Sequence, residues 1–317
     1  MGAGKSKHTK LRYEGTKFSS GAMATLTEQI KAKALEVGFS KVGIAKAEVL
    51  TDDGKKLQAW LHRRYQASMG WMEENVKKRI DPAEIVPGAR SVISVAANYY
   101  TGVEHHPKND EGKISRYAWG DDYHILITVR IKKLFESIKQ IAPESDGRYY
   151  VDTGPVMDKV WAEHAGIGWR GKHTNLITKD FGSWVFLGEI ISTLELEYDA
   201  PMEDFCGSCT VCLDACPTKA IVEPYVVDSS KCISYLTIEH RGEIDKSLEP
   251  LFDKWVYGCD ICQDVCPWNK YQQPTRDNEF LPRDGNVTPS LDGLTSLTQG
   301  EFSRRFSKSP IKRTKRE

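Results

Sequence analysis

The sequence has no apolar run approaching the roughly 20 residues that a membrane-spanning helix requires, and no apolar stretch follows its first residues as in a secretory signal. Cysteine is absent outside residues 206–266. With 317 residues, 40% of them hydrophobic and 28% charged, the chain is long enough for about two globular domains. We therefore expect a soluble, cytoplasmic monomer with no membrane partner.

A net charge is also absent, since 44 basic residues balance 44 acidic ones. The distribution is nevertheless uneven. Residues 301–317 hold seven lysines and arginines against two glutamates, and residues 1–22 are also basic, so the body between them is acidic. A basic end on an acidic body indicates either contact with a polyanion or merely a solvated run of charge.

The first residues, "MGAGKSKHTK", contain fragments of two short motifs. "GAGKS" is similar to the end of a phosphate-binding loop, but the first glycine of that motif and its preceding strand are missing. "MGAGKS" also fits the loose N-myristoylation pattern, which is short enough to occur by chance. We expect residues 1–22 to be a disordered leader, or an added extension, before a natural start at Met23.

Hydrophobic periodicity in residues 23–200 predicts strands that alternate with helices. The predicted elements are a helix from Thr25 or Thr27 to about Gly38, a strand from about Lys41, a strand over 91–100, a helix over 121–141 capped by Asp121 or Asp122, a strand over 148–152, a helix from Pro155 and a strand over 183–191. This alternation predicts a layered α/β domain.

The stretch "CGSCTVCLDACPTKAI" contains four cysteines: Cys206, Cys209, Cys212 and Cys216. A disulfide scaffold is typical of secreted proteins, and no secretory signal is seen here. A structural zinc site uses two separated pairs of ligands. The spacing instead follows the C-x2-C-x2-C-x3-C-P pattern of bacterial ferredoxins with two 4Fe–4S clusters.

The second run, "YGCDICQDVCPWN", is one cysteine short of this pattern, and Cys232 is available as the missing ligand. In such ferredoxins the last cysteine of each run binds the other cluster. One predicted ligand set is therefore Cys206, Cys209, Cys212 and Cys266, and the other is Cys216, Cys232, Cys259 and Cys262. These sets predict a ferredoxin-like domain over 201–275, followed by a basic segment over 276–317, with zinc as the alternative metal.

A formal G-x-G-x-x-G sequence lies over residues 166–171. A dinucleotide site needs a strand before these glycines and a helix after them. Here a helical pattern precedes them and a strand-like segment follows. We interpret them as a connection in which the backbone passes close to another part of the chain.

Asp152 lies at the end of the predicted strand over 148–152. An acid in this position facing a redox centre is a candidate proton donor, and a helix cap is the alternative. If Pro155 occupies the first helical position, Gly154 is the cap and Asp152 lies too far upstream. His124, on the preceding helix, fits either a structural or a catalytic role.

Six motifs together resemble those of the bacterial epoxyqueuosine reductases: "RYAWGDDYH", "VDTGPV", "AGIGWRGKHTNLI", "CGSCTVCLDACPTKAI", "CISYLTIEHRGEI" and "YGCDICQDVCPWN". The cysteine runs alone would fit many proteins, but their order behind the other motifs is specific. The resemblance extends from about Met23 to the end of the chain.

This resemblance implies an α+β protein, in which a nitroreductase-like α/β domain that binds cobalamin precedes the two-cluster ferredoxin-like domain. It implies reduction of the epoxide of epoxyqueuosine at the wobble position of tRNA, with Asp152 as proton donor. An electron donor such as a flavodoxin or a ferredoxin is a further implied partner. The residues implied to contact cobalamin are Tyr117, Asp122, Tyr123, His124, Gly168 and Lys172.

Two other functions stay open on the sequence: a cobalamin-dependent enzyme similar to the reductive dehalogenases, and a protein that only transfers electrons. A respiratory dehalogenase ordinarily has a twin-arginine leader, and residues 1–22 contain no Arg-Arg pair. Relatives commonly continue into helical repeats beyond the segment that matches "SPIKRTKRE". The chain is therefore expected to be either truncated or a short-form enzyme, and in both cases to bind tRNA more weakly. The basic residues of its last segment would still suit phosphate contacts.

Overall fold

The computed structural model describes residues 24–315, so the predicted leader over 1–22 lies outside the described residues. The central sheet has the strand order β1-β2-β7-β4, and every neighbouring pair is antiparallel. Its strands are β1 (Lys41–Lys46), β2 (Ser91–Asn98), β7 (Val185–Ser192) and β4 (Gly147–Tyr150). All eight residues of β2 are buried, because this strand lies between two others and both faces of the sheet are covered.

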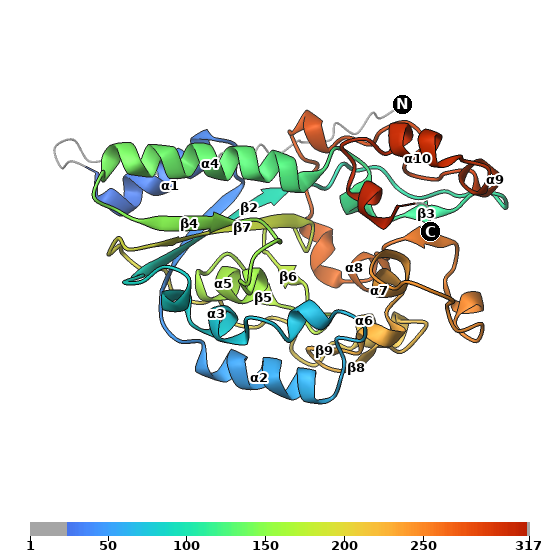
Figure 1. The fold of residues 1–317 in the computed structure, drawn as a ribbon, viewed down its shortest axis with the longest axis horizontal. Helices are drawn as coiled ribbons and strands as arrows, with labels where there is room; N and C mark the ends of the chain where they lie inside the picture. The colour runs from blue at the N-terminus through green and yellow to red at the C-terminus, as the bar shows by residue number, and fades with distance from the viewer. Residues whose placement is uncertain (1–23, 316–317) are drawn as a thin grey trace, which may run out of the picture.

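Helices α1 (Leu26–Glu36) and α4 (Tyr123–Ile141) cover one face of the sheet (Figure 1). Thr25 caps α1 through a capping box with Glu28, and Asp122 caps α4. Four apolar residues of α4, spaced three or four apart, face the core: Ile127, Ile131, Leu134 and Ile138. The predicted boundaries of these helices are confirmed.

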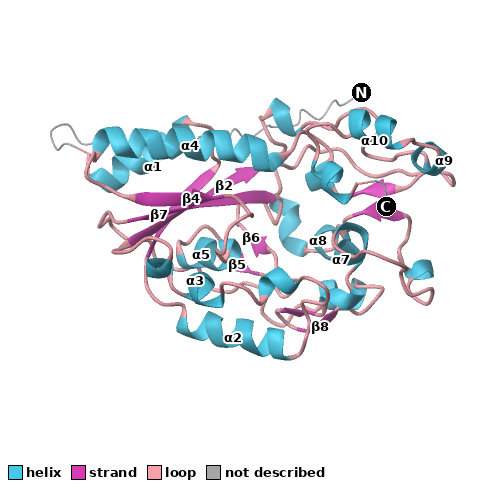
Figure 2. Cartoon of the chain, in the orientation of Figure 1, coloured by secondary structure: helices cyan, strands magenta, loops and turns pink. Residues whose placement is uncertain are grey.

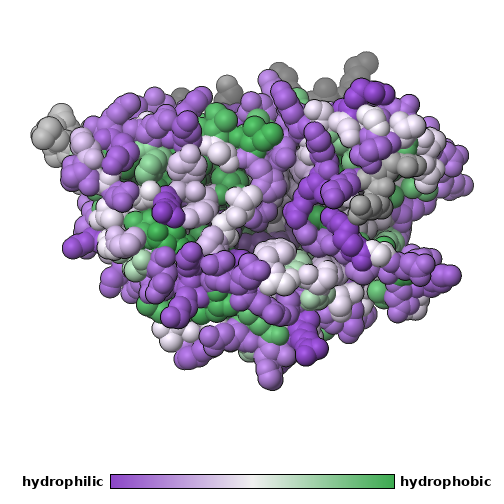
Figure 3. All heavy atoms as spheres, viewed as in Figure 1, coloured by the Kyte–Doolittle hydropathy of each residue, from purple (hydrophilic) through white to green (hydrophobic). Residues whose placement is uncertain are grey.

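The other face of the sheet is covered by α5 (Asp158–His164), with α2 (Thr51–His62) and α3 (Val76–Ile80) beyond it (Figure 1). The mixed arrangement of helices and sheet, clear in Figure 2, confirms the predicted α+β class. No helix within residues 24–315 is both long enough and apolar enough to cross a membrane. The face shown in Figure 3 is largely hydrophilic, with separate apolar spots.

Short elements make up the rest of the described chain. The helices are α6 (Val211–Ala215), α7 (Ile233–Ile238), α8 (Ile261–Asp264), α9 (Leu291–Thr295) and α10 (Gln299–Arg305). The paired strands are β5 (Trp169–Arg170) with β6 (Leu176–Ile177), β8 (Ile221–Glu223) with β9 (Val226–Val227), and β3 (Lys113–Ile114) with β10 (Trp255–Tyr257). The 3₁₀ helices are Gly70–Met72, Pro82–Glu84, Arg116–Ala118, Ser229–Lys231, Glu249–Leu251, Pro267–Tyr271, Asn278–Phe280 and Pro310–Thr314.

The C-terminal segment is part of this fold. Phe306 is 1% exposed and Ile311 is 5% exposed. Both pack in one core with Trp119, from the sheet domain, and Tyr257, from the cysteine-rich segment. The three predicted parts of the chain therefore share a hydrophobic core, which fixes the position of each relative to the others.

Candidate active site

The eight cysteines come together because α6 and α8 pack against each other. Helix α6 carries Cys212 and is followed directly by Cys216, and α8 carries Cys262. The other five lie in loops or at helix starts: Cys206, Cys209, Cys232, Cys259 and Cys266. All eight are free thiols.

Electrostatic interactions divide the thiols into two groups. Burial raises the pKa of Cys212 to about 11, and the thiols that add to this effect are Cys266, Cys206 and Cys209. Burial also raises the pKa of Cys262 well above its ordinary value, with further contributions from Cys259, Cys232, Cys216 and then Cys212. Cys212 thus interacts with the other three thiols of one predicted set, and Cys262 with the other three of the second set and with Cys212; the assignment of each set to one cluster stays a prediction.

The donor chemistry of these groups suits iron–sulfur clusters. Each group offers four thiols, the ligand set of a 4Fe–4S cluster. Within residues 24–315, no group of three or more His, Cys, Asp or Glu side chains is arranged to hold a single metal ion. We call Cys216, Cys232, Cys259 and Cys262 the inner set, because they line the cavity described next, and we call Cys206, Cys209, Cys212 and Cys266 the outer set.

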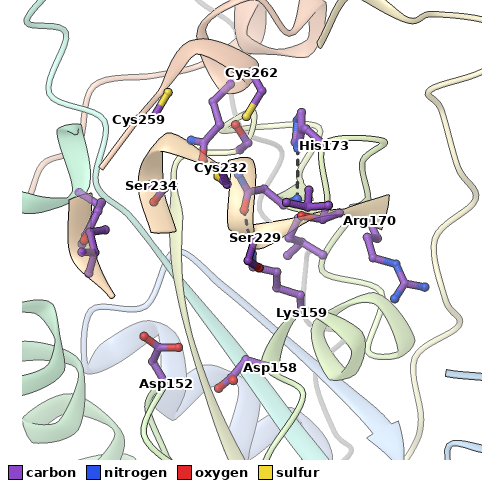
Figure 4. Close-up of a pocket in the computed structure, with 18 of the residues that line it drawn as sticks. Asp152, Asp158, Lys159, Arg170, His173, Ser229, Cys232, Ser234, Cys259 and Cys262 are labelled. Carbon is purple, nitrogen blue, oxygen red and sulfur yellow. Dashed lines mark hydrogen bonds between the residues drawn. The ribbon is translucent and has the colours of Figure 1, made fainter. Parts of the chain in front are cut away.

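A cavity of about 1020 Å³ lies between the sheet domain and the cysteine-rich segment. All four residues of the inner set line it, whereas none of the outer set does. Figure 4 shows Cys232, Cys259 and Cys262 across this cavity from Asp152 and Asp158. Thiol and carboxyl side chains therefore both line this cavity.

Asp152 belongs to a connected group of four side chains, three of which line the cavity. The hydroxyl of Tyr123 donates a hydrogen bond to Oδ2 of Asp152 at 2.5 Å. Nε2 of His124 lies 3.5 Å from the same oxygen. Nδ1 of His124 lies 2.8 Å from Oδ1 of Asp122, which also caps α4. The start of α4 thus places Tyr123 and His124 against the carboxylate of Asp152, and Asp122 against the far side of His124.

These contacts determine which side chain of this group, His124 or Asp152, is protonated at neutral pH. Partial desolvation in the cavity opposes ionisation of Asp152, but the contacts with His124 and Tyr123 outweigh it and lower its pKa. Burial likewise opposes the charge on His124, yet its hydrogen bonds to Asp122 and Asp152 raise its pKa to about 9. At neutral pH His124 is therefore protonated and Asp152 is a carboxylate.

The loop that carries Asp152 differs from the prediction. Helix α5 begins at Asp158, not at Pro155, and no side chain caps it. Gly154 packs so closely on the preceding strand that a Cβ there would lie 2.1 Å from Cδ1 of Tyr150, so the chain crosses the strand end before it turns into the helix. Asp152 has a φ of 55°, in the left-handed region. Asp152 is therefore free of a capping role.

Two acids beside the cavity are missed by the sequence interpretation. Glu189 is 0% exposed within β7. Burial, followed by the charge of nearby Asp158, raises the pKa of Glu189 well above its ordinary value. Burial also raises the pKa of Asp158. A single glutamate in the apolar run over 183–191 is the signal that could have revealed this pair of neighbouring acids.

The residues implied to contact cobalamin fall into two groups. Tyr117, Tyr123 and His124 line the cavity, and Asp122 lies behind His124. Gly168 and Lys172 do not line it.

The two residues outside the cavity have structural contacts instead. A Cβ on Gly168 would lie 2.1 Å from the carbonyl oxygen of Ile177, which confirms the predicted close backbone approach. Nζ of Lys172 donates hydrogen bonds to the backbone carbonyls of Gly207 and Cys209, at 2.6 and 2.9 Å. Lys172 therefore holds the loop of the outer thiol set.

Family models match two segments of the chain. Residues 79–153 match the model "Epoxyqueuosine reductase QueG, DUF1730", and residues 205–269 match the "4Fe-4S double cluster binding domain". The second match confirms the prediction of two 4Fe–4S clusters. It covers all eight cysteines.

Curated relatives are similar over most of the chain. An epoxyqueuosine reductase of Synechocystis is 48% identical over 278 residues, which cover 86% of this chain and 96% of the relative. The Escherichia coli epoxyqueuosine reductase is 42% identical over 294 residues, which cover 91% of this chain and 77% of the relative.

Solved structures agree with these relatives. An epoxyqueuosine reductase with an epoxyqueuosine-modified tRNA stem loop has a TM-score of 0.85 and 32% identity, covering 91% of this chain and 79% of that chain. One from Bacillus subtilis, whose catalytic aspartate loop is swung out of the active site, has a TM-score of 0.84 and 30% identity over the same shares. With this fold, these motifs and this identity, the chain belongs to the epoxyqueuosine reductase family.

Proposed function

We propose that the protein reduces the epoxide of epoxyqueuosine in tRNA to the alkene of queuosine, with release of water. The observation that carries this proposal is one cavity that joins the inner thiol set to the Asp152–His124 pair. Anaerobic protein loaded with iron, sulfide and cobalamin should convert epoxyqueuosine-containing tRNA when a chemical reductant is added. Mass spectrometry of the nucleosides tests this, and an absence of queuosine would contradict it.

The cavity fits a large cofactor such as cobalamin. Its volume of about 1020 Å³ is at the upper end of the roughly 300–1,000 Å³ usual for small-molecule sites. Five buried polar atoms of its lining residues have no hydrogen-bond partner within residues 24–315: Nε of Arg79, Oδ1 of Asp158, Nε2 of His173, Oγ of Ser183 and Nε2 of Gln263. A ligand rich in amide groups would satisfy such atoms.

The side chains that would hold these groups follow from their positions. Tyr117, Tyr123 and His124 would contact cobalamin, and the two thiol sets would bind the two clusters. When bound, the clusters would store and pass single electrons, and cobalamin would supply a low-potential metal centre for the reduction.

Asp152, His124 and Tyr123 are placed to supply protons to the reaction. Reduction of an epoxide to an alkene and water consumes two electrons and two protons, and one aspartate can hold only one proton. The low pKa of Asp152 leaves that carboxyl group ionised at neutral pH, whereas His124, 3.5 Å away, is protonated. We therefore assign the proton store to His124 and the transfer toward the departing oxygen to Asp152. Tyr123 orients the carboxylate through its hydroxyl.

The first prediction concerns pH. Turnover should fall as the pH rises through the pKa of His124, about 9, because the proton store is then empty. Removing the charge of Asp122 should shift this fall to lower pH by roughly one unit or more, the usual effect of a close opposite charge. Asp122→Asn suits the test because asparagine is also a good helix N-cap. The measurement is the pH profile of single-turnover rates.

A histidine in another acid pair provides the control. Nε2 of His164 lies 3.1 Å from Oδ2 of Asp53, and His164→Gln should leave the profile unchanged. An unchanged alkaline limb in Asp122→Asn would remove His124 from the proton path.

The basic C-terminal segment is the proposed contact for tRNA phosphates. Arg313 and Pro310 line the cavity, so this segment borders the site. Its truncation would also remove Phe306 and Ile311 from the core, because both are buried. Substitution of exposed lysines is therefore the appropriate test.

Lys308 and Lys312 are exposed in this segment. Replacing both by glutamine should weaken tRNA binding, and it should lower the slope of log K against log salt by about 0.7–0.9 for each phosphate that is no longer neutralised. Fluorescence anisotropy with labelled tRNA measures both effects. The same substitutions at Lys132 and Lys133, exposed on α4, serve as the control. Equal slopes in all three proteins would mean that the segment is only solvated.

A further inference from the structure

The outer thiol set faces away from the substrate cavity. None of Cys206, Cys209, Cys212 and Cys266 lines that cavity, whereas all four inner cysteines do. Cys206 and Cys209 are partly exposed at the molecular surface. A protein that delivers electrons can thus approach the outer set without entering the space that the substrate needs.

Aromatic side chains surround this set at the surface. Trp169 is buried with Cys266, and Cys206 and Trp268 pack against them. The ring of Trp268 lies 5.7 Å from that of Phe205 and 5.5 Å from that of Tyr271. Phe205 is 37% exposed and Tyr271 is 46% exposed. An exposed aromatic surface thus continues directly into the packing around two cysteines.

Two lysines complete this surface. Nζ of Lys179 lies 4.2 Å from the ring centroid of Phe205, and Nζ of Lys270 lies 4.8 Å from that of Tyr271. Both lysines are exposed, and neither forms a salt bridge within the described part of the chain. We call Phe205, Trp268, Tyr271, Lys179 and Lys270 the outer patch.

None of the nearby acids forms a salt bridge with these lysines within the described residues. Asp180 pairs with Lys41. Asp204 accepts hydrogen bonds from the backbone N–H of Cys206 and from the hydroxyl of Tyr225. Glu203, the other acid of that loop, forms no salt bridge within the described residues either. The outer patch therefore presents ring faces and unpaired cations, a composition typical of interfaces with acidic partners.

We propose that the outer patch is the docking surface for the electron donor, and that this donor is a small acidic protein carrying a one-electron prosthetic group near its surface. The proposal rests on the proposed function, which requires two electrons for each epoxide reduced. Two successive one-electron transfers oxidise two donor molecules, and the two protons come from the active site and solvent. A nucleic acid could also stack on exposed rings, but the basic segment that borders the cavity offers tRNA a separate surface.

The test compares a charge-reversed patch with a matched control in the cluster-loaded protein. Lys179→Glu/Lys270→Glu changes the patch, and Lys132→Glu/Lys133→Glu makes the same change in charge on α4. Stopped-flow absorbance would follow reduction of the clusters by reduced flavodoxin, by reduced ferredoxin and by dithionite. Fluorescence anisotropy would measure flavodoxin, ferredoxin and tRNA binding.

At low salt the patch variant should be reduced by the better of the two protein donors roughly ten times more slowly than wild type, with weaker salt dependence, because steering by charge is removed. Its affinity for that donor should fall in parallel. Reduction by dithionite, tRNA binding and the control variant should match wild type.

Other outcomes would overturn the proposal. Wild-type rates with both protein donors would show that neither docks at the patch. Slower reduction by dithionite as well would indicate a structural role, and weaker tRNA binding would indicate an RNA surface. Failure of the proposed function would look different, since the clusters would then be reduced normally while no queuosine formed.

Discussion

The Asp152→Asn enzyme is expected to reduce epoxyqueuosine-containing tRNA roughly a hundred to ten thousand times more slowly than wild type, the usual contribution of a general acid. Asparagine has nearly the same size, and it tolerates the left-handed backbone, with its φ of 55°, that residue 152 adopts. The amide cannot take a proton from His124 and pass it on. The loss should therefore appear in the chemical step and not in assembly.

Single-turnover kinetics of fully loaded enzyme measure this step. Iron content, cobalamin content and tRNA affinity should equal those of wild type. Asp146→Asn is a suitable control, because Asp146 is exposed and its carboxylate accepts a hydrogen bond from the neighbouring N–H of Gly147. A rate within a fewfold of wild type would remove Asp152 from the mechanism, and lower cobalamin content would indicate a structural role.

The Cys232→Ser protein is expected to contain about four irons instead of about eight and to lose turnover, because one of two 4Fe–4S clusters is missing. Cys232 occupies the N-cap of α7 and lines the cavity. Serine is a favoured N-cap residue, so the helix should form normally. Iron analysis and the visible spectrum of anaerobic protein measure the loss.

Cys206→Ser is the matched variant in the outer set. It should also lose about four irons, but it should retain the cluster that faces the cavity. The two variants should therefore differ in spectrum while agreeing in iron content. Stoichiometric zinc with negligible iron in wild-type protein, made anaerobically with ample iron, would contradict both expectations.

Local patterns in the sequence predict most of the helices and strands of the sheet domain. The capping box at Thr25, the apolar spacing along α4 and the wholly buried strand β2 are each encoded within a few neighbouring residues. Pro155 shows the limit of such patterns. Proline favours the first turn of a helix, but the packing of Gly154 on Tyr150 moves the start of α5 to Asp158.

The close grouping of the cysteines was predictable for a similar reason. Three of the four cysteines in the first run lie within seven residues, so spacing alone restricts what they can bind. Lys172 and Gly168 were not predictable in this way. Their partners, Cys209 and Ile177, became neighbours through loop packing that no local pattern records.

The sequence by itself determined the α+β elements, the two groups of cysteines and the position of Asp152 at a strand end. Only the tertiary structure decided which thiol set faces the cavity and which acids keep their protons. Ionisation depends on burial and on charges brought in from distant segments. Asp152 is ionised because α4 places His124 and Tyr123 against it, whereas Glu189 stays protonated because the sheet buries it beside Asp158.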